Sequence, residues 1–334
     1  MPPLRVALVG AGWIAGDHVT VLRQLGGVEI AAVCDLDSEK AERLAPPGAR
    51  VYAGWEELLE REAIDALWVC TPPLVHRPPA VAALERGIPV FLEKPVARTL
   101  EDAEAIVEAW ERSGAACAVG YQWRATEALE TLGEILAGQE VALLLAKSFG
   151  PTQARPWFVD RAQGGGNVLE RASHQVDLVR AVGGEVVSVQ ASAAGVLLAH
   201  GEGERGDIED AAAITLGLAG GAVASVVIAW TRESHQGLYS LDVLASDATL
   251  SLVLDPEFRL EGVSRGRRVE ARSGTHPFQR QISRFLEAAR AGDPKMVFCT
   301  PADAFGTLSA CVAAEHALAT GETVAQPVRP RGRG

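Results

Sequence analysis

One stretch near the N-terminus decides the fold: residues 5–15, which read RVALVGAGWIA. After Arg5 the chain is apolar up to Val9, as in a buried strand. Gly10, Gly12 and Ala15 then fit the pattern GxGxxG/A, placed directly between that strand and a helical pattern. Such a turn lets the backbone approach a pyrophosphate at the N-terminus of the helix. The stretch therefore predicts the first βα unit of a dinucleotide-binding Rossmann sheet.

Outward from this turn, short apolar runs alternate with amphipathic stretches as far as residue 120. Strands are expected at 5–9, 29–34, 50–52, 66–70, 89–92 and 116–119, and helices at 18–25, 38–44, 55–61, 76–86 and 100–112. This alternation is typical of a parallel sheet with helices on both faces. We therefore predict an α/β Rossmann domain with a doubly wound parallel sheet at residues 1–121.

Beyond residue 121 the pattern changes, because strands follow one another through short turns such as Gly220-Gly221 and Ser246-Asp247. The expected strands are 141–149, 186–198, 211–218, 222–229, 239–244 and 249–253, and the expected helices are 127–136, 168–182, 276–290 and 301–320. We assign residues 122–334 to an α+β domain for substrate binding and oligomerisation, with a large, mostly antiparallel, open-faced sheet. Its last helix can pack back on the first domain.

The helices of this second domain suffice to cover only one face of its sheet. The run 222–229 would leave an apolar face in need of cover. A homodimer or homotetramer through that face is therefore expected.

Composition limits the partners. The 334 residues contain 31 Lys and Arg against 43 Asp and Glu, and a net charge of −12 argues against a nucleic-acid partner. No apolar run approaches the length of a membrane span, and no leader pattern precedes the first strand, so we expect a cytoplasmic protein without a membrane partner. The five cysteines are scattered, without metal-binding spacing, and predict buried thiols and no metal site.

Asp35 ends the second expected strand, 23 residues after Gly12. A carboxylate at that point accepts hydrogen bonds from the ribose hydroxyls of an adenosine. The 2′-phosphate of NADP would meet repulsion from Asp35 and from the nearby Asp37, so NAD(H) is favoured over NADP(H). The alternative is that Asp35 only caps the following helix.

Further motifs make the chain resemble the Gfo/Idh/MocA oxidoreductases, a family of sugar, cyclitol and related dehydrogenases. Residues 71–76 (TPPLVH) and 90–95 (VFLEKP) are similar to the family's TPxxxH and EKP motifs, and residues 120–124 (GYQWR) to the run that opens its second domain. Residues 164–177 (GGGNVLERASHQVD) resemble its glycine-rich segment ending in HxxD. The resemblance covers nearly the whole chain.

Together with the Gly-rich turn, the resemblance implies a set of cofactor-binding residues: Gly10, Gly12, Trp13, Ile14, Asp35, Thr71, Pro72, His76, Glu93, Lys94 and Gln122. It also implies that Lys94 contacts the reacting oxygen and the nicotinamide ribose, and that His174 transfers the proton. Because Lys94 and His174 serve one carbinol centre, we expect them to converge on one pocket with Glu170.

Glu170 precedes His174 by four residues on an expected helix, so their side chains share a face. A hydrogen bond from the imidazole to this carboxylate would fix the tautomer of His174 and stabilise its protonated form. The alternative is a solvated contact without a catalytic role. The family usually has Asp at the position of Glu170 and Gly at that of Ala172, so the relay geometry is expected to differ here.

Three further residues, Arg124, Arg155 and Trp157, are weaker candidates for a polyol pocket. Trp157 fits core packing equally well. His18 has no partner that the sequence identifies.

These observations favour an NAD(H)-dependent dehydrogenase that moves a hydride between nicotinamide and a secondary alcohol or carbonyl of a sugar, cyclitol or related polyol. One alternative is an NAD-dependent glycoside hydrolase that oxidises its substrate transiently. The other is a non-catalytic NAD-binding regulator, which would have no need of Lys94 and His174.

Overall fold

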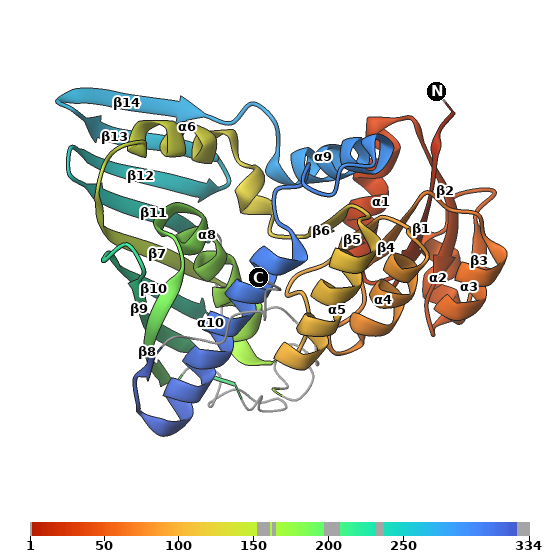
Figure 1. The fold of residues 1–334 in the computed structure, drawn as a ribbon, viewed down its shortest axis with the longest axis horizontal. Helices are drawn as coiled ribbons and strands as arrows, with labels where there is room; N and C mark the ends of the chain where they lie inside the picture. Colours follow the sequence, from red (N-terminus) through yellow and green to blue (C-terminus); the bar gives the residue numbers. More distant parts are fainter. Residues whose placement is uncertain (1, 152–160, 162–164, 197–207, 232–236, 326–334) are drawn as a thin grey trace. The chain divides into compact units, whose positions relative to one another are not determined.

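The computed structural model describes residues 2–151, 161, 165–196, 208–231 and 237–325. The chain divides into two compact units (Figure 1). Unit 1 consists of Met1–Tyr121 and Phe278–Phe305, and unit 2 of Gln122–Pro277 and Gly306–Gly334. Residues 278–305, which we assigned to the second domain, therefore group with the first unit.

Unit 1 is built on a six-stranded parallel sheet in the order β3-β2-β1-β4-β5-β6. Its elements are β1 (Leu4–Val9), α1 (Trp13–Leu25), β2 (Val28–Cys34), α2 (Ser38–Leu44), β3 (Arg50–Tyr52), α3 (Trp55–Arg61), β4 (Ala66–Val69), η1 (Pro73–Val75), α4 (Arg77–Glu85), β5 (Val90–Leu92), α5 (Leu100–Ser113), β6 (Cys117–Val119) and α9 (Pro277–Ala291). This strand order is that of a Rossmann sheet, whose ligands bind at the carboxyl ends of the strands. The predicted doubly wound half is confirmed.

An aromatic cluster explains why α9 belongs to unit 1. Trp68 of β4 and Phe91 of β5 stack with ring centroids 5.7 Å apart. Phe285 of α9 meets both rings edge-on, at 5.1 Å and 5.5 Å, and is fully buried. The apolar face of α9 therefore completes the core of the Rossmann sheet.

Unit 2 is built on a nine-stranded sheet in the order β14-β13-β12-β11-β7-β10-β9-β8-β15. Its elements are η2 (Gln122–Ala125), α6 (Glu127–Leu136), β7 (Val141–Pro151), η4 (Val168–Ala172), α8 (Ser173–Gly183), β8 (Val186–Ala194), β9 (Ala211–Leu218), β10 (Val223–Thr231), β11 (Leu238–Ala245), β12 (Ala248–Asp255), β13 (Arg259–Ser264), β14 (Arg267–Arg272), most of α10 (Pro301–Thr320) and β15 (Val324–Ala325). All pairings are antiparallel except that of β7 with β10. The predicted α+β half with a mostly antiparallel sheet is confirmed, but its strands β13, β14 and β15 were not predicted.

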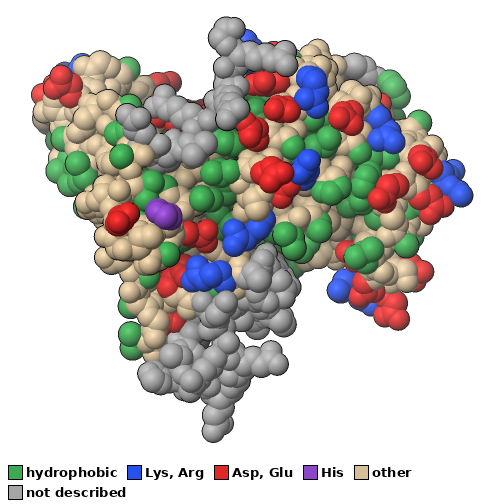
Figure 2. Space-filling model, turned by 60° about the horizontal axis from the view of Figure 1, so that its bottom comes forward, with side chains coloured by type: hydrophobic (Ala, Val, Ile, Leu, Met, Phe, Trp, Pro, Cys, Tyr) green, Lys and Arg blue, Asp and Glu red, His purple; other side chains and the backbone are tan. Residues whose placement is uncertain are grey.

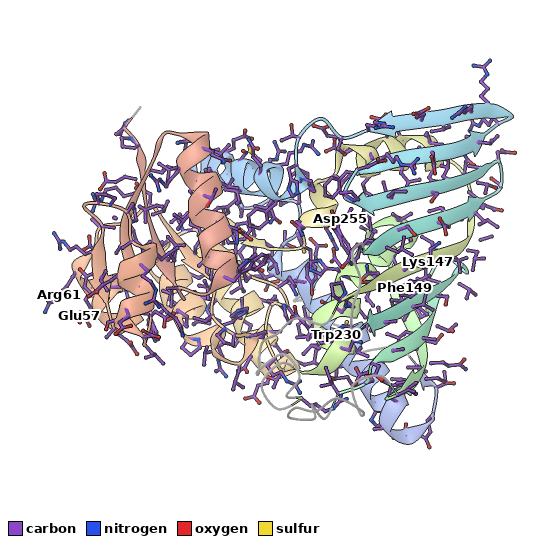
Figure 3. The ribbon with its side chains drawn as sticks, turned by 180° about the vertical axis from the view of Figure 1, so that it is seen from behind. Glu57, Arg61, Lys147, Phe149, Trp230 and Asp255 are labelled. Carbon is purple, nitrogen blue, oxygen red and sulfur yellow. The ribbon has the colours of Figure 1, made fainter. Side chains whose placement is uncertain are left out.

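The two faces of this sheet differ in burial. Along β10 the side chains of Ala224, Val226, Ile228 and Trp230 are buried, and α8 and η4 pack against this inner face. The alternate residues of β10 point to the other face, as does Phe149 of the neighbouring β7, which pairs with Ala229 (Figure 3). On that outer face of the described strands the side chains remain partly or fully exposed. The sheet is therefore open on one side.

Acidic and basic side chains lie intermixed over the face of the molecule drawn in Figure 2. Among the described helices, none combines the length and the low polarity that a bilayer crossing requires. On this face, the acidic and basic side chains therefore do not form a single patch of one charge.

Candidate active site

The glycine-rich turn after β1 has the geometry that its sequence predicts. Gly10 has φ +96°, and a Cβ there would lie 2.7 Å from the carbonyl group of Cys70. Gly12 directly precedes α1 and makes no side-chain cap, while a Cβ on it would meet no atom within 4 Å. The backbone at Gly12, directly before the N-terminus of α1, is thus not crowded, as the approach of an anion to that helix end requires. Ala15 is fully buried and lets the helix pack closely.

Asp35 lies at the carboxyl end of β2, beside this turn. Its Oδ2 accepts a hydrogen bond from the Ala11 backbone N–H at 2.7 Å, and its Oδ1 accepts one from the Asp37 N–H at 2.9 Å. Asp37, not Asp35, caps α2, because its side chain accepts from the Lys40 N–H. The helix-cap alternative for Asp35 is therefore wrong, and its carboxylate is fixed next to the turn.

A buried ion pair holds the strand end that carries Lys94. His18 Nε2 lies 2.8 Å from Glu93 Oε1, and both side chains are buried. Glu93 Oε2 also accepts a hydrogen bond from the Lys94 backbone N–H at 3.1 Å. Burial raises the pKa of Glu93, but the hydrogen bond and charge of His18 and the charge of Lys94 outweigh it, so this pKa is lowered overall. Glu93 is therefore an ionised anchor for the backbone of Lys94.

Sequence reasoning missed His18, which is 75 residues from Glu93. Its ring also packs against Phe91 and against Phe278 of α9, with centroids 4.9 Å and 4.7 Å apart. The only sequence signal is a histidine on the apolar face of α1, which does not identify a partner.

His76 links two loops of unit 1. Its Nε2 lies 2.7 Å from the Thr71 carbonyl oxygen and its Nδ1 lies 3.3 Å from that of Val96. Burial lowers the pKa of this fully buried imidazole, despite opposing contributions from both carbonyls. Both ring nitrogens face carbonyl oxygens, which can only accept, so the nitrogen that carries the proton is the donor. His76 therefore fixes the loop after β4 against the segment that follows Lys94.

The remaining cofactor candidates lie at or near the surface of their units. Trp13 is 63% exposed, Ile14 and Thr71 are half-buried, Pro72 is exposed, and Gln122 begins η2 with its side chain half-buried. Arg155 and Trp157 lie outside the described residues.

In unit 2 the HxxD segment forms a π-helical turn, η4, followed by α8. Gly166 has φ +84°, and Asn167 donates to the backbone carbonyls of Glu209 and Asp210, 3.3 Å away. The Val168 N–H donates to the Glu209 carboxylate at 3.0 Å. These contacts anchor the start of the turn to the residues just before β9.

The predicted hydrogen bond between Glu170 and His174 stays a prediction. Residues 168–172 are π-helical, so the α-helical spacing assumed for this pair does not hold over that turn. The imidazole of His174 packs against Trp123, with ring centroids 4.8 Å apart. Trp123 in turn lies 5.8 Å from the Tyr239 ring. Both Glu170 and His174 remain partly exposed.

Arg124 forms an ion pair with Asp177 in the interior of unit 2. Its Nε and Nη2 donate to the two carboxylate oxygens of Asp177 at 2.7 Å and 2.9 Å. Thr307 of α10 donates to the same carboxylate and accepts from Arg180, both at 2.9 Å. This network ties η2, α8 and α10 together, which gives Arg124 a structural contact that the sequence did not indicate.

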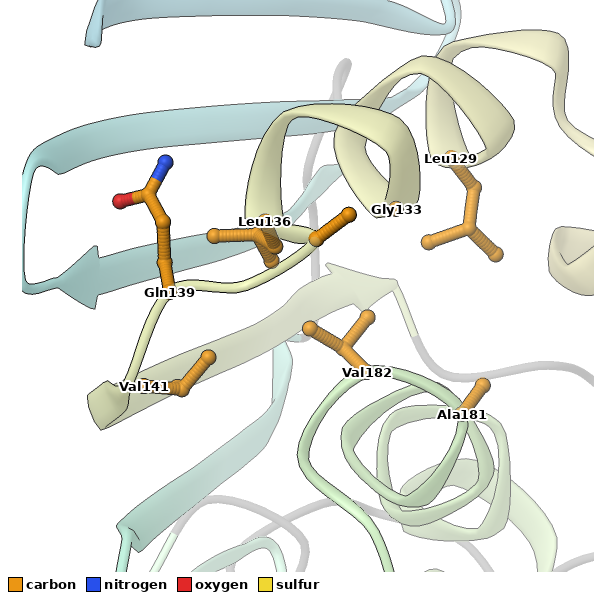
Figure 4. A pocket seen from close by; sticks show the side chains of 8 residues that line it. Leu129, Gly133, Leu136, Gln139, Val141, Ala181 and Val182 are labelled. Carbon is orange, nitrogen blue, oxygen red and sulfur yellow. The ribbon is translucent and has the colours of Figure 1, made fainter. Parts of the chain in front are cut away.

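No group of three or more metal-ligating side chains occurs among the residues that the structure describes. A pocket elsewhere in unit 2 is lined by residues of α6, the loop after it, β7 and the end of α8: Leu129, Gly133, Leu136, Ala137, Gln139, Val141, Ala181 and Val182 (Figure 4). Apart from Gln139 its lining offers aliphatic side chains, so it provides no acid, base or nucleophile.

Comparison with known proteins gives the same family for both halves. Residues 4–121 match the sequence model described as "Oxidoreductase family, NAD-binding Rossmann fold", and residues 130–251 match that of the GFO/IDH/MocA C-terminal domain. Over 195 residues the chain is 32% identical to inositol 2-dehydrogenase of Arthrobacter sp. (strain FB24), a match that covers 56% of this chain and 56% of that protein. The chain thus spans about half the length of this curated relative.

Two further matches extend over more of the chain. D-apiose dehydrogenase of Paraburkholderia graminis is 26% identical over 264 residues, which cover 76% of this chain and 68% of that protein. The crystal structure of an oxidoreductase domain protein from Kribbella flavida has a TM-score of 0.85 and 20% identity, covering 98% of this chain and all of that one. At this identity the structural match shows the shared fold.

Proposed function

The chain belongs to the Gfo/Idh/MocA family of oxidoreductases, and on that premise we propose that it is an NAD(H)-dependent dehydrogenase of sugars, cyclitols or related polyols. The reaction is reversible hydride transfer at a secondary alcohol or carbonyl carbon. The observation that carries the proposal is the anchored pair Glu93-Lys94 at the carboxyl end of β5, in the same unit as the open helix N-terminus after Gly12. Relatives named inositol 2-dehydrogenase and D-apiose dehydrogenase support the substrate class.

The residues of unit 1 fit a dinucleotide. Gly12 leaves the N–H groups of α1 open to a pyrophosphate, and the fixed carboxylate of Asp35 can accept hydrogen bonds from ribose hydroxyls. When bound, nicotinamide supplies the hydride acceptor or donor. Asp35, with Asp37 next to it, would repel a 2′-phosphate, so we propose that NAD(H) is preferred over NADP(H).

Side chains of this protein transfer the proton of the substrate hydroxyl and stabilise the charge that develops on its oxygen. Lys94 places an ammonium group at the reacting oxygen and stabilises the developing alkoxide. His174 takes the proton of the substrate hydroxyl during oxidation and returns it during reduction. Glu170 orients the imidazole of His174 and stabilises its protonated form.

We propose a homodimer or homotetramer that forms through the open face of the second sheet. The outer face of β10 and its neighbours carries exposed apolar side chains such as Val223 and Leu244, and the ion pair between Lys147 and Asp242 lies among them (Figure 3). Light scattering at micromolar concentration should give a particle of at least two chains. A particle of one chain would contradict this assembly.

A cytoplasmic location is also proposed. All five cysteines are free and buried, which suits a reducing compartment.

The proposed reaction is tested by incubating the protein with NAD and a panel of polyols, inositols and aldoses while following the absorbance of NADH. A dehydrogenase produces NADH in equal amount to oxidised product. Release of a sugar without net NADH would instead identify the glycoside hydrolase. No turnover with any substrate, despite tight NADH binding, would favour the regulator.

A further inference from the structure

Arg171 carries a positive charge onto the inner face of the second sheet. The residue lies in the π-helical turn, and its Nη1 donates to Ser148 Oγ at 3.3 Å and its Nη2 to the Pro151 carbonyl at 3.4 Å. The guanidinium also lies 5.5 Å from the ring centroid of Trp230 and 6.0 Å from that of Tyr239. Aromatic faces and neutral oxygens therefore hold this cation.

Arg171 differs from the other partly buried arginines of unit 2 in its charge balance. Arg124, Arg161 and Arg180 each contact a carboxylate directly, those of Asp177, Glu209 and Glu185. No carboxylate among the described residues forms an ion pair with Arg171. Burial lowers the pKa of its guanidinium, and the charge interaction and hydrogen bond with Tyr239 and the charge of Glu170 oppose this shift only in part. An anion brought to Arg171 would thus meet a cation that has lost much of its hydration.

Gly150 of β7 has no side chain at the point where the Tyr239 hydroxyl and the Arg171 guanidinium come together. A Cβ at this glycine would lie 2.7 Å from the Tyr239 hydroxyl oxygen and 3.3 Å from Nη1 of Arg171. Any larger residue would therefore crowd the hydroxyl and the guanidinium at the same point. Both groups can donate to one acceptor, the guanidinium through a planar fork that matches a carboxylate.

The same cluster reaches the residue proposed to transfer the proton. The Tyr239 ring lies 5.8 Å from that of Trp123, whose ring lies 4.8 Å from the imidazole of His174. A chain of ring contacts through Trp123 and Tyr239 therefore connects His174 to Arg171.

We propose that Arg171 and Tyr239 bind a carboxylate of the substrate, so that the substrate class is the hydroxy acids derived from sugars rather than neutral polyols. This inference rests on the proposed function, because it assigns the anionic end of the substrate whose carbinol is oxidised. It names Arg171 as the specificity-determining residue.

The test measures binding, so that it does not depend on turnover. Calorimetric titrations of the full-length protein with saturating NADH compare glucuronate with glucose, galacturonate with galactose, and gluconate with glucitol. Wild type is expected to bind the acid of at least one pair about tenfold or more tightly, as for hydrogen bonds to a charged group. Arg171→Met should abolish that preference and leave the affinity for the neutral partner within about threefold.

Matched variants separate this role from a structural one. Arg268→Met removes an arginine whose side chain is 84% exposed on β14, and it should keep the full preference for the acid. Tyr239→Phe keeps the ring and removes one donor, so a smaller loss, about threefold to tenfold, is expected for the acid alone. Melting curves establish that each variant folds.

Two results would overturn the inference: equal binding of acid and neutral partner in every pair, or a preference that survives in both Arg171→Met and Tyr239→Phe. A preference for the acid without hydride transfer to any member of the panel would leave this inference standing and would contradict the proposed function instead.

Discussion

Glu93 in unit 1 and Glu170 in unit 2 both belong to the motifs that suggested a dehydrogenase, yet their surroundings differ. Glu93 is buried, accepts a backbone N–H and pairs with His18. Glu170 is partly exposed on a π-helical turn, four residues before His174. The first half of the site is rigid because backbone groups hold it. In the second half, the imidazole of His174 packs against the ring of Trp123.

The largest effect is expected in the second half, from His174→Ala. If this imidazole transfers the proton, kcat should fall by about 10²- to 10⁴-fold while NADH affinity stays nearly unchanged. Steady-state kinetics and calorimetry measure the two quantities. His316→Ala, which removes an exposed imidazole on α10, is the control. A kcat within threefold of wild type would remove His174 from the mechanism.

The next largest effect concerns stability, and it should come from the rigid half. His18→Ala would leave the Glu93 carboxylate buried without its ion-pair partner, at a cost of about 3 kcal/mol in the free energy of unfolding. Chemical denaturation measures this loss, and His316→Ala should change it by less than about 0.5 kcal/mol. A comparable loss in both variants would show that the buried pair has no special part in stability.

The stability of the protein at acid pH should also depend on the pair of His18 and Glu93. The pKa of Glu93 is lowered in the folded protein from its ordinary value of 4.5. Its stabilising contribution is therefore present above about pH 4.5 and is lost as pH falls through the lower folded value. His18→Ala should flatten the pH dependence of the melting temperature in that window. An acid limb identical to that of wild type would contradict this assignment.

A smaller effect distinguishes ligand binding from folding at the Gly-rich turn. Gly12→Ala adds a Cβ into open space, so the melting temperature should change little while NADH affinity falls about tenfold or more. Gly16→Ala, in α1 with equally open surroundings, should keep NADH affinity and gain up to about 1 kcal/mol of stability. Equal NADH affinity in Gly12→Ala and wild type would place the pyrophosphate elsewhere.

The smallest effect is expected from Glu170→Asp. Because this substitution keeps the negative charge of the carboxylate, it should change kcat by less than about tenfold. Glu170→Gln, which removes the charge, should cost more and should lower the apparent pKa in the kcat profile. A larger loss in the Asp variant than in the Gln variant would show that geometry, not charge, matters here.

The sequence predicted the Rossmann half well because glycine identity encodes backbone geometry: Gly10 adopts a positive φ beside Cys70. Contacts between distant residues were not predictable. The amphipathic pattern of α9 shows that it has an apolar face, but not that Phe285 packs on Trp68. The pairing of His18 with Glu93 has no local signal for the same reason.

Two local features of unit 2 also escaped prediction. Strands β13 and β14 are rich in Arg and Glu, and β14 has no fully buried residue, so neither shows an apolar run. The π-helical turn at Val168–Ala172 has the same apolar residues that an α-helix would show. Apolar periodicity over five residues cannot distinguish a π-helical turn from an α-helical one.

The central claim is hydride transfer, and isotope transfer tests it most directly. NADH deuterated at C4 of the nicotinamide is mixed with the carbonyl form of a substrate found in the panel, and the product is analysed by mass spectrometry and NMR. We expect one deuterium on the carbinol carbon of the product, and loss of this transfer in His174→Ala and Lys94→Ala. Product without deuterium at that carbon would contradict it.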